Sequence, residues 1–232
     1  MNEVITPNYA PALRMKAGEL AGLQSLAGDI AARILPRLIV PPPKERDRKL
    51  QSELFRLPEQ PRVHSLLGNC WVRKPVLLQC SYLMREIRSE AEKWLPALFS
   101  DARDHGIAAV AAFTLSEVAS LGSVARASVS HLDELAVGII VSSAELGDPK
   151  LAENMRSVLD ALRLDPAKCV VLADFSDADL SEPEIVAPII RASYDRLQEL
   201  GPWRYIAFQG TSFPEHNPAS HNQTVRVDRH GW

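Results

Sequence analysis

The 232-residue sequence predicts an α/β fold, specifically a TIM-barrel-like (β/α) barrel with seven recognisable strands. Short apolar runs alternate with longer amphipathic stretches, and successive runs begin about 25 to 40 residues apart, which is the spacing of βα units. The apolar runs lack strict apolar–polar alternation, as expected of strands that are covered on both faces. Seven units use the whole chain, so we expect the eighth unit of a barrel to be missing or vestigial.

The seven predicted strands are short aliphatic runs bounded by turn-forming residues. They cover residues 9–15, 34–40, 76–80, 107–113, 135–141, 169–174 and 205–208. Pro36 cannot donate a ladder hydrogen bond, so pairing in the second strand is expected to begin after it.

Helices are predicted between these strands from apolar residues at helical spacing. They cover residues 17–31, 44–57, 85–103, a stretch after Thr114, 151–162 and a last helix through Leu200. Thr114 and Glu117 fit a capping box, and Asp148 followed by Pro149 fits another helix start. Pro96 is expected to kink or divide its helix, and Pro188 to open or kink the last one.

Composition places the chain among ordinary globular proteins, with 46% hydrophobic and 24% charged residues. We expect one barrel-like domain over residues 1–215 and a C-terminal tail over residues 216–232. No run reaches the roughly 18 to 20 apolar residues of a membrane helix. The start of the chain is too polar for a signal peptide, so a cytoplasmic protein that does not bind membranes is expected.

The net charge of −3 gives no overall field that would attract nucleic acid. Residues 44–48 are basic, but Glu45 and Asp47 dilute their charge, so nucleic-acid binding is not predicted. The three cysteines lack CxxC spacing, which argues against a disulfide framework or a zinc knuckle. Neither GxGxxG nor GxxxxGK[ST] follows a strand, and no cofactor is predicted.

Candidate site residues follow the predicted strands, because the loops at the carboxyl ends of barrel strands carry function. The predicted ligand-binding residues are Lys16, Asp174, Gly210, Thr211 and Ser212. The Gly-Thr-Ser loop is small and rich in donors, which suits a phosphate or carboxylate. A tight turn, with Phe213 closing the core, explains the same residues without a ligand.

Metal sites and catalytic residues are less well supported. Asp174, with Asp177 and Asp179, can hold a divalent cation or act as acid and base, but the segment lacks the glycine of an EF-hand loop and fits a capped turn equally well. His216 and His221 in the tail form neither HxH nor HxxxH, so no metal site is predicted. GxSxG is absent, and catalytic residues remain unknown.

Four blocks of sequence carry a resemblance to a known family: YAPALRMKAGE, ILPRLIVPP, VVLADF and WRYIAFQGTSFPE. In these blocks and their order, the chain resembles the family called beta protein. The resemblance implies a barrel-like βα fold without an assigned biochemical activity, found in phages and in bacterial loci that serve defence. Members carry acids near the ends of the second and third strands, where this chain has Ile39 and Gln79. They also continue past an arginine- and tryptophan-containing segment into another strand, whereas this sequence stops at VRVDRHGW.

Two function hypotheses follow. In the first, the loss of acids at Ile39 and Gln79 indicates a non-catalytic barrel that binds a protein partner in a phage or defence context. A partner or a second copy of the chain would then cover the open edges of the first and seventh strands. In the alternative, Lys16, Asp174 and the Gly210–Ser212 loop form a small anion-binding hydrolase or transferase site, in which Lys16 pairs with an anion or with Asp174.

Overall fold

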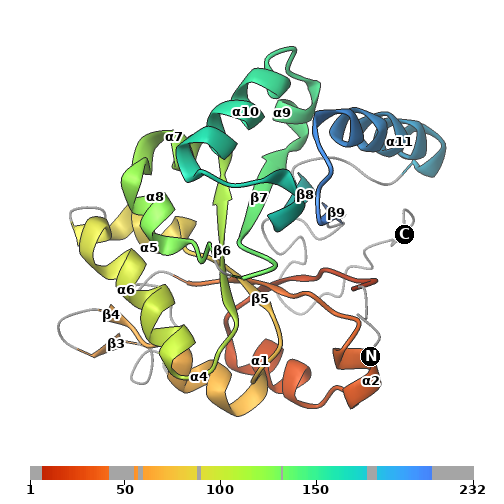
Figure 1. Cartoon of the computed structure of the whole chain (residues 1–232). Coiled ribbons are helices and arrows are strands. Elements are labelled where there is room, and N and C mark those ends of the chain that lie inside the picture. Colours follow the sequence, from red (N-terminus) through yellow and green to blue (C-terminus); the bar gives the residue numbers. More distant parts are fainter. Residues whose placement is uncertain are drawn as a thin grey trace, which may run out of the picture.

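The computed structural model describes residues 7–41, 55–56, 60–87, 90–131, 133–176 and 182–210. Its main feature is one seven-stranded sheet in which every neighbouring pair is parallel. The strands lie in chain order, β1-β2-β5-β6-β7-β8-β9 (Figure 1). This order is what successive βα units build, so the predicted α/β class is confirmed.

All seven predicted strands are present, with ends shifted by a few residues. They are β1 Ala12–Arg14, β2 Arg37–Ile39, β5 Val76–Gln79, β6 Ala109–Thr114, β7 Val137–Ser142, β8 Cys169–Phe175 and β9 Tyr205–Gly210. The strand β2 begins directly after Pro36, as predicted, although an isolated parallel bridge joins Ile34 to Tyr9 before it. Two further strands, β3 Phe55–Arg56 and β4 Gln60–Pro61, form a small antiparallel pair.

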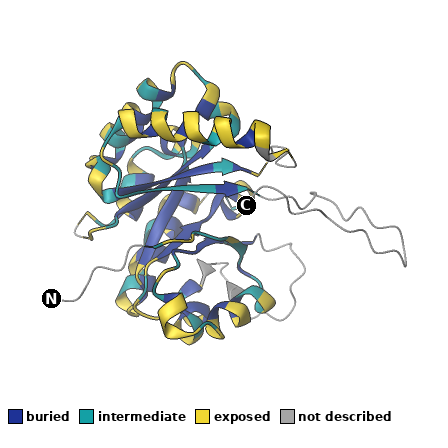
Figure 2. Ribbon diagram, turned by 90° about the vertical axis from the view of Figure 1, so that its right-hand side faces the viewer, coloured by how far each residue is buried: buried dark blue, intermediate teal, exposed yellow. Residues whose placement is uncertain are grey.

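Helices cover the outer face of the sheet, with buried strands inside and exposed residues along the outer helix surfaces (Figure 2). Those before β6 are α1 Ala17–Gln24, α2 Gly28–Ala31, α4 Val63–Cys70, α5 Ser81–Glu86 and α6 Ala91–Asp104. Those after β6 are α7 Leu115–Leu121, α8 Ser123–Ser128, α9 Ser143–Gly147, α10 Leu151–Leu162 and α11 Pro183–Leu200, with a 3-10 turn at Pro166–Lys168. The capping box of Thr114 and Glu117 begins α7 as predicted, and Ser142 and Glu145 form a second one at α9.

Three predicted helices are divided in the structure. The 17–31 stretch breaks between α1 and α2, and the 85–103 stretch breaks before α6, so Pro96 lies inside α6 instead of dividing it. Gly122 separates α7 from α8 with a positive φ of 49°, a conformation that glycine adopts at little steric cost. The last helix begins at Pro183, and Pro188 lies within it.

The prediction of a helix over residues 44–57 is wrong for residues 55 and 56, the part of this stretch that the structure describes. Phe55 and Arg56 pair with residues 60–61 as a strand, because cross-strand pairing overrides a weak helical pattern. Residues 42–54 lie outside the described residues. The short helix α4 was not predicted from the sequence.

The sheet curls into a half-barrel with a small apolar core on its concave face. This inner cluster comprises Leu35, Leu77, Val110, Ala112, Ile140, Val170 and Leu172. A larger cluster fills the space between the convex face and the helices. At the two edge strands, Nε2 of Gln209 in β9 donates to the carbonyl oxygen of Ala10, just before β1, over 2.7 Å. The curl therefore brings the two ends of the sheet together near Ala10.

Among the described residues, no helix is both long and apolar enough to cross a membrane.

Candidate functional site

The inner face of the half-barrel changes from apolar to polar at the carboxyl ends of its strands. On the five strands β5 to β9, an apolar inward residue is followed two positions later by a polar one near the strand end. Arg37, the first residue of β2, follows Leu35 in the same way, and the strand register keeps all these residues on one face. We call these six residues the inner polar ring: Arg37, Gln79, Thr114, Ser142, Asp174 and Gln209. The ring lies where parallel α/β sheets carry their ligand sites.

Arg37 and Asp174 form an ion pair across the ring. Nη1 of Arg37 in β2 donates to Oδ2 of Asp174 in β8 over 2.7 Å, and both side chains are largely buried, with exposed fractions of 5% and 13%. The sequence hypothesis paired Asp174 with Lys16 or left it to a ligand; the structure pairs it with Arg37.

The charge state of Asp174 follows from this pairing. Burial raises the pKa of the carboxyl group, but the guanidinium of Arg37 and hydrogen bonds from Ser176 and Arg37 outweigh burial, so the pKa is lowered. The backbone N–H of Ser176 donates to Oδ1 over 3.0 Å. Asp174 therefore stays ionised at neutral pH and is poorly suited to proton transfer there.

Several buried polar atoms of the ring lack a hydrogen-bond partner among the described residues. They are Nε of Arg37, Oε1 of Gln79 and Oε1 of Gln209. The Nε2 atoms of the two glutamines are used, since Gln79 donates to the Ser81 hydroxyl over 2.9 Å and Gln209 to Ala10. An unpartnered buried polar atom costs about 1–3 kcal/mol, which a ligand or a bound water recovers.

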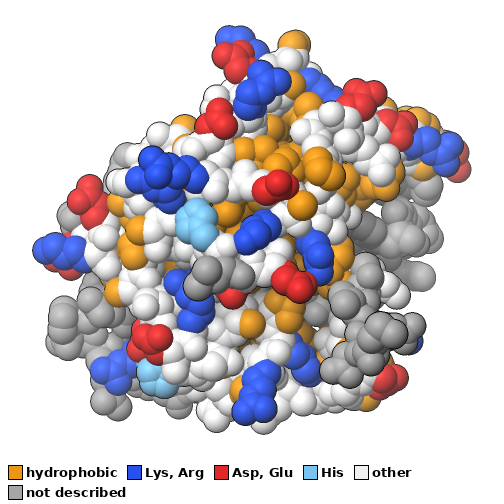
Figure 3. Space-filling view, in the orientation of Figure 1, with side chains coloured by type: hydrophobic (Ala, Val, Ile, Leu, Met, Phe, Trp, Pro, Cys, Tyr) orange, Lys and Arg blue, Asp and Glu red, His pale blue; other side chains and the backbone are white. Residues whose placement is uncertain are grey.

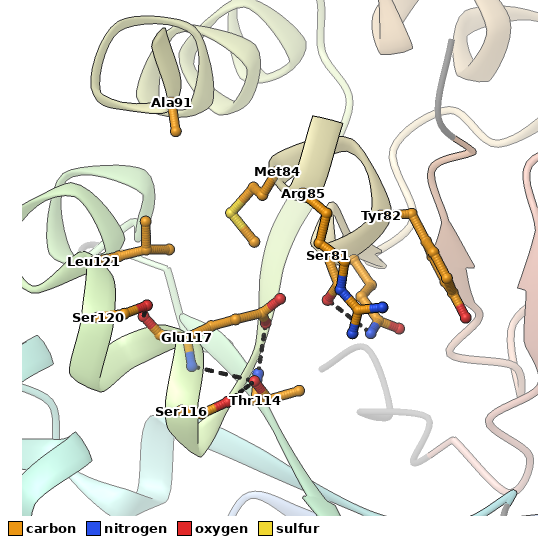
Figure 4. Close-up of a pocket in the computed structure, with 11 residues that line it drawn as sticks. Ser81, Tyr82, Met84, Arg85, Ala91, Thr114, Ser116, Glu117, Ser120 and Leu121 are labelled. Atoms are coloured by element: carbon orange, nitrogen blue, oxygen red, sulfur yellow. Dashed lines mark hydrogen bonds between the residues drawn. The ribbon is translucent and has the colours of Figure 1, made fainter. Parts of the chain in front are cut away.

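A cavity of about 430 Å³ opens from the ring at the carboxyl ends of β5 and β6. Figure 4 shows Thr114, Ser116 and Glu117 on one side, Ser81 on another, and Met84 pointing into the space near Leu121. Further lining residues are Gln79, Tyr82, Arg85, Ala91 and Ser120. The lining is therefore rich in hydroxyl groups.

The charged side chains near this cavity, Glu117, Arg85 and Arg14, have different partners. Glu117 and Thr114 form the two hydrogen bonds of their capping box. Oε2 of Glu117 accepts from the Thr114 N–H over 2.9 Å, and the Thr114 hydroxyl accepts from the Glu117 N–H. The guanidinium of Arg85 lies 5.5 Å from the centre of the Tyr82 ring, and that of Arg14 lies 5.6 Å from the same ring. Arg85 is the cation that lines the cavity.

Glu19, in α1, lies close to the end of β1. Burial raises the pKa of its carboxyl group, and the positive charges of Lys16 and Arg14 only partly offset this effect. Oε2 of Glu19 is buried without a hydrogen-bond partner among the described residues. Lys16, the residue before α1, is thus part of a charged group at the same end of the sheet as Asp174.

Nucleophilic chemistry finds little support in this arrangement. Burial, reinforced by the charge of Asp165, raises the pKa of the Cys169 thiol to about 12, and burial also raises the pKa of Cys80 above its usual range. Neither thiol forms thiolate at neutral pH. The hydroxyl of Ser142 donates to Glu145 over 2.7 Å as part of a helix cap.

The structure describes only part of the predicted site. Lys16 follows β1, Asp174 is the residue before the last of β8, and Gly210 is the last residue of β9, all at the carboxyl end of the sheet. Thr211, Ser212 and the tail over residues 216–232 lie outside the described residues, as do Asp177, Asp179 and the 44–48 segment.

Sequence reasoning missed Arg37, Thr114 and Gln209 as site residues. Arg37 lies within a strand and not after it, and Thr114 was interpreted only as a helix cap. The signal that identifies them is a polar residue two positions after an inward apolar one near a strand end, as in Leu35–Arg37 and Ala207–Gln209.

Comparison with known proteins gives one informative match. A search of curated proteins finds no match to this chain. The sequence matches the family model described as Beta protein over residues 9–232. Because that match extends over nearly the whole chain and includes every strand of the curled sheet, the protein belongs to the Beta protein family.

Proposed function

We propose that this protein binds a small anionic ligand at the carboxyl ends of its strands, without turning it over. The observation that carries the proposal is the inner polar ring. Buried atoms of its residues Arg37, Gln79 and Gln209 lack partners among the described residues, and Gln79 also lines the hydroxyl-rich cavity. Native proteins rarely leave such atoms unpaired when they are buried. A polar ligand supplies the missing partners.

The proposal treats the half-barrel as a member of the TIM-barrel type. In that type, the carboxyl-terminal loops carry the ligand site and the opposite end serves stability. The all-parallel sheet in chain order and the Gln209–Ala10 hydrogen bond between the edge strands support this interpretation.

An anion is favoured because Arg85 makes no ion pair with any described residue, whereas the carboxylate that shares its cavity already accepts a hydrogen bond. Arg85 lines the cavity, whereas Glu117 is engaged in its capping box and Asp174 in its ion pair. Over the face shown in Figure 3, Lys and Arg side chains lie among Asp and Glu side chains. Attraction of an anion is therefore local to the mouth, because opposite charges nearby cancel at longer range.

Binding without turnover is favoured over a hydrolase or transferase. A lowered pKa keeps Asp174 ionised, the buried thiols are protonated, and the Ser142 hydroxyl is engaged by Glu145. Acid–base catalysis needs a group that exchanges a proton near neutral pH, and a carboxylate nucleophile needs an oxygen that is free to attack. Both oxygens of Asp174 are engaged, since Oδ2 accepts from Arg37 and Oδ1 accepts from the N–H of Ser176.

The test compares glycerol phosphate with glycerol by backbone amide chemical-shift mapping of the full chain. Glycerol phosphate should shift the amides of Gln79, Ser81 and Ser116, and glycerol should not. Arg85→Gln should weaken the response at least about tenfold, since a charge-assisted hydrogen bond contributes about 1.5–3 kcal/mol. Arg156→Gln, on the exposed face of α10, is the matched control and should leave it unchanged.

Unshifted amides at millimolar glycerol phosphate, or equal responses in Arg85→Gln and Arg156→Gln, would contradict anion binding at this cavity.

A second candidate function is binding of a protein partner at the sheet edges, in the phage or defence context that the family resemblance implies. Among the described residues, β1 pairs only with β2, and β9 pairs only with β8. Unpaired strand edges are sites for pairing with another chain. Light scattering of the purified chain should then give a mass above 25.6 kDa if a second copy covers an edge. This candidate would be contradicted by a monomeric chain in which no partner strand protects the amides of β1 and β9 from hydrogen exchange.

A further inference from the structure

Outside the inner polar ring, two histidines and an aspartate gather between α4 and α6. His64 lies in the first turn of α4, Asp101 in the last turn of α6, and His105 directly after α6. The two helices pack against each other on the outer layer (Figure 1). One ligand atom from each of the three residues lies within 4.8 Å of the other two.

The contacts within this group place a ring nitrogen directly against a carboxylate oxygen. Nδ1 of His64 is buried and has no hydrogen-bond partner among the described residues, yet it lies against Oδ2 of Asp101. A ring nitrogen and a carboxylate oxygen in this position need a proton or a cation between them. The Asp101 carboxylate is about half exposed, at 47%, so it has room to turn toward a cation.

His105 has its tautomer set by the backbone. Its Nδ1 lies 2.7 Å from the carbonyl oxygen of Asp101, and a carbonyl only accepts, so Nδ1 carries the proton. Nε2 of His105 then carries the lone pair. A backbone carbonyl that holds one imidazole nitrogen while the other faces a metal is a common arrangement around bound metals. The rings of His64 and His105 stack with centroids 4.0 Å apart and an interplanar angle of 13°. Because the lone pair of each nitrogen lies in the plane of its own ring, one ring has to turn before both reach the same ion, and the His105 side chain, which is 53% exposed, has room to turn.

We propose that His64, Asp101 and His105 bind one divalent transition-metal ion, of which Zn²⁺ fits best. Imidazole nitrogen and carboxylate oxygen are ligands that Zn²⁺ accepts, and three protein ligands leave a fourth position for water. Mg²⁺ and Ca²⁺ prefer all-oxygen sites and fit this set poorly. The ion would join α4 to α6, two segments whose ligands lie about forty residues apart in the chain.

The test titrates Zn²⁺ alone into chelator-stripped full-length protein by calorimetry. Wild type should bind one ion at this cluster, and His105→Gln, which changes an exposed side chain, should weaken binding by more than the about 10- to 100-fold that loss of an outer partner costs. His64→Gln should do the same. Co²⁺ in place of Zn²⁺ should give a visible spectrum of nitrogen and oxygen ligands without a thiolate charge-transfer band.

Two controls separate this site from other histidines. His131→Gln changes an exposed histidine outside the cluster, and a triple variant of His216, His221 and His230 removes those of the tail. Both should keep the wild-type affinity. Zn²⁺ should also raise the thermal midpoint of wild type but not of His105→Gln.

The proposal is overturned if wild type binds no Zn²⁺ stoichiometrically, if His105→Gln binds as wild type does, or if the tail variant alone loses the ion. In the first case, a proton and not a metal ion lies between His64 and Asp101. None of these results depends on the anion site at the inner polar ring.

Discussion

Arg37 and Asp174 lie 137 residues apart in the chain, and their side chains meet at 2.7 Å. Three strands separate β2 from β8 in the sheet, so in a flat sheet their backbones would lie roughly 19 Å apart at about 4.8 Å per step. Only a strongly curled sheet brings these two side chains into contact. The ion pair is thus a direct consequence of the half-barrel shape, and it links the site to the fold.

Loss of one partner of this ion pair should be costly. Asp174→Asn leaves the Arg37 charge buried without a carboxylate, and we expect the free energy of unfolding to fall by about 3–5 kcal/mol. The double variant Arg37→Met with Asp174→Leu should lose less than the sum of the two single changes, because it leaves no unpaired charge. Urea denaturation measures both.

Glu134→Gln serves as the control, because the Arg204–Glu134 pair is exposed. Its cost should lie within about 1 kcal/mol. Equal losses for Asp174→Asn and Glu134→Gln would show that the buried pair does not stabilise the fold.

The pH dependence of stability should report the lowered pKa of Asp174. The unfolded chain takes up a proton on this group at its ordinary pKa of about 3.9, whereas the folded chain keeps the carboxylate ionised to lower pH. The stabilisation is therefore fully present above about pH 4 and is lost as pH falls through the folded pKa. Wild type should lose its stability advantage over Asp174→Asn in acid. A difference that stays constant down to acid pH would contradict the lowered pKa.

Glu19 should behave in the opposite sense. Burial raises its pKa, so the folded chain holds the proton at pH values where the unfolded chain has lost it. The folded state is then favoured below the unfolded pKa, about 4.3, and this advantage is lost as pH rises through the folded pKa. Glu19→Gln removes the ionisation, so the variant should unfold at higher urea than wild type at neutral pH, with the gain vanishing in acid. A variant less stable at neutral pH would mean that attraction to Lys16 and Arg14 outweighs burial.

Two glycine substitutions should change stability in opposite directions. A Cβ at Gly138, in β7, would lie 3.3 Å from Ala112 Cβ and 3.3 Å from Leu77 Cδ2, so Gly138→Ala overpacks the inner cluster and should cost about 1–3 kcal/mol. A Cβ at Gly22, in α1, meets nothing within 4 Å, and Gly22→Ala should add about 0.5–1 kcal/mol through helix propensity. Thermal unfolding of both variants measures whether each change raises or lowers the stability of the fold. A gain for Gly138→Ala would show that Leu77 moves aside freely.

The sequence alone predicted the elements whose signal is local. Each of the seven strands is a run of aliphatic residues, and the capping box of Thr114 and Glu117 begins its helix as expected, because both signals depend on neighbours within a few residues. The break between α1 and α2 at residues 25–27, and the end of α5 at Glu86 ahead of α6, were not predicted. Apolar spacing continues through those residues, and packing against the sheet decides where each helix ends.

Only the tertiary structure decided which residues form the site. Asp174 was recognised from its place after a strand, but Arg37, its partner, became identifiable only once the sheet curled and brought β2 opposite β8. The same holds for His64, which reaches Asp101 and His105 through the packing of α4 on α6. The hydrophobic pattern along the chain specifies strands and helices because it depends only on residues within one helical turn or one strand pleat. Contacts between distant side chains depend on curvature and helix packing, and no local pattern encodes these.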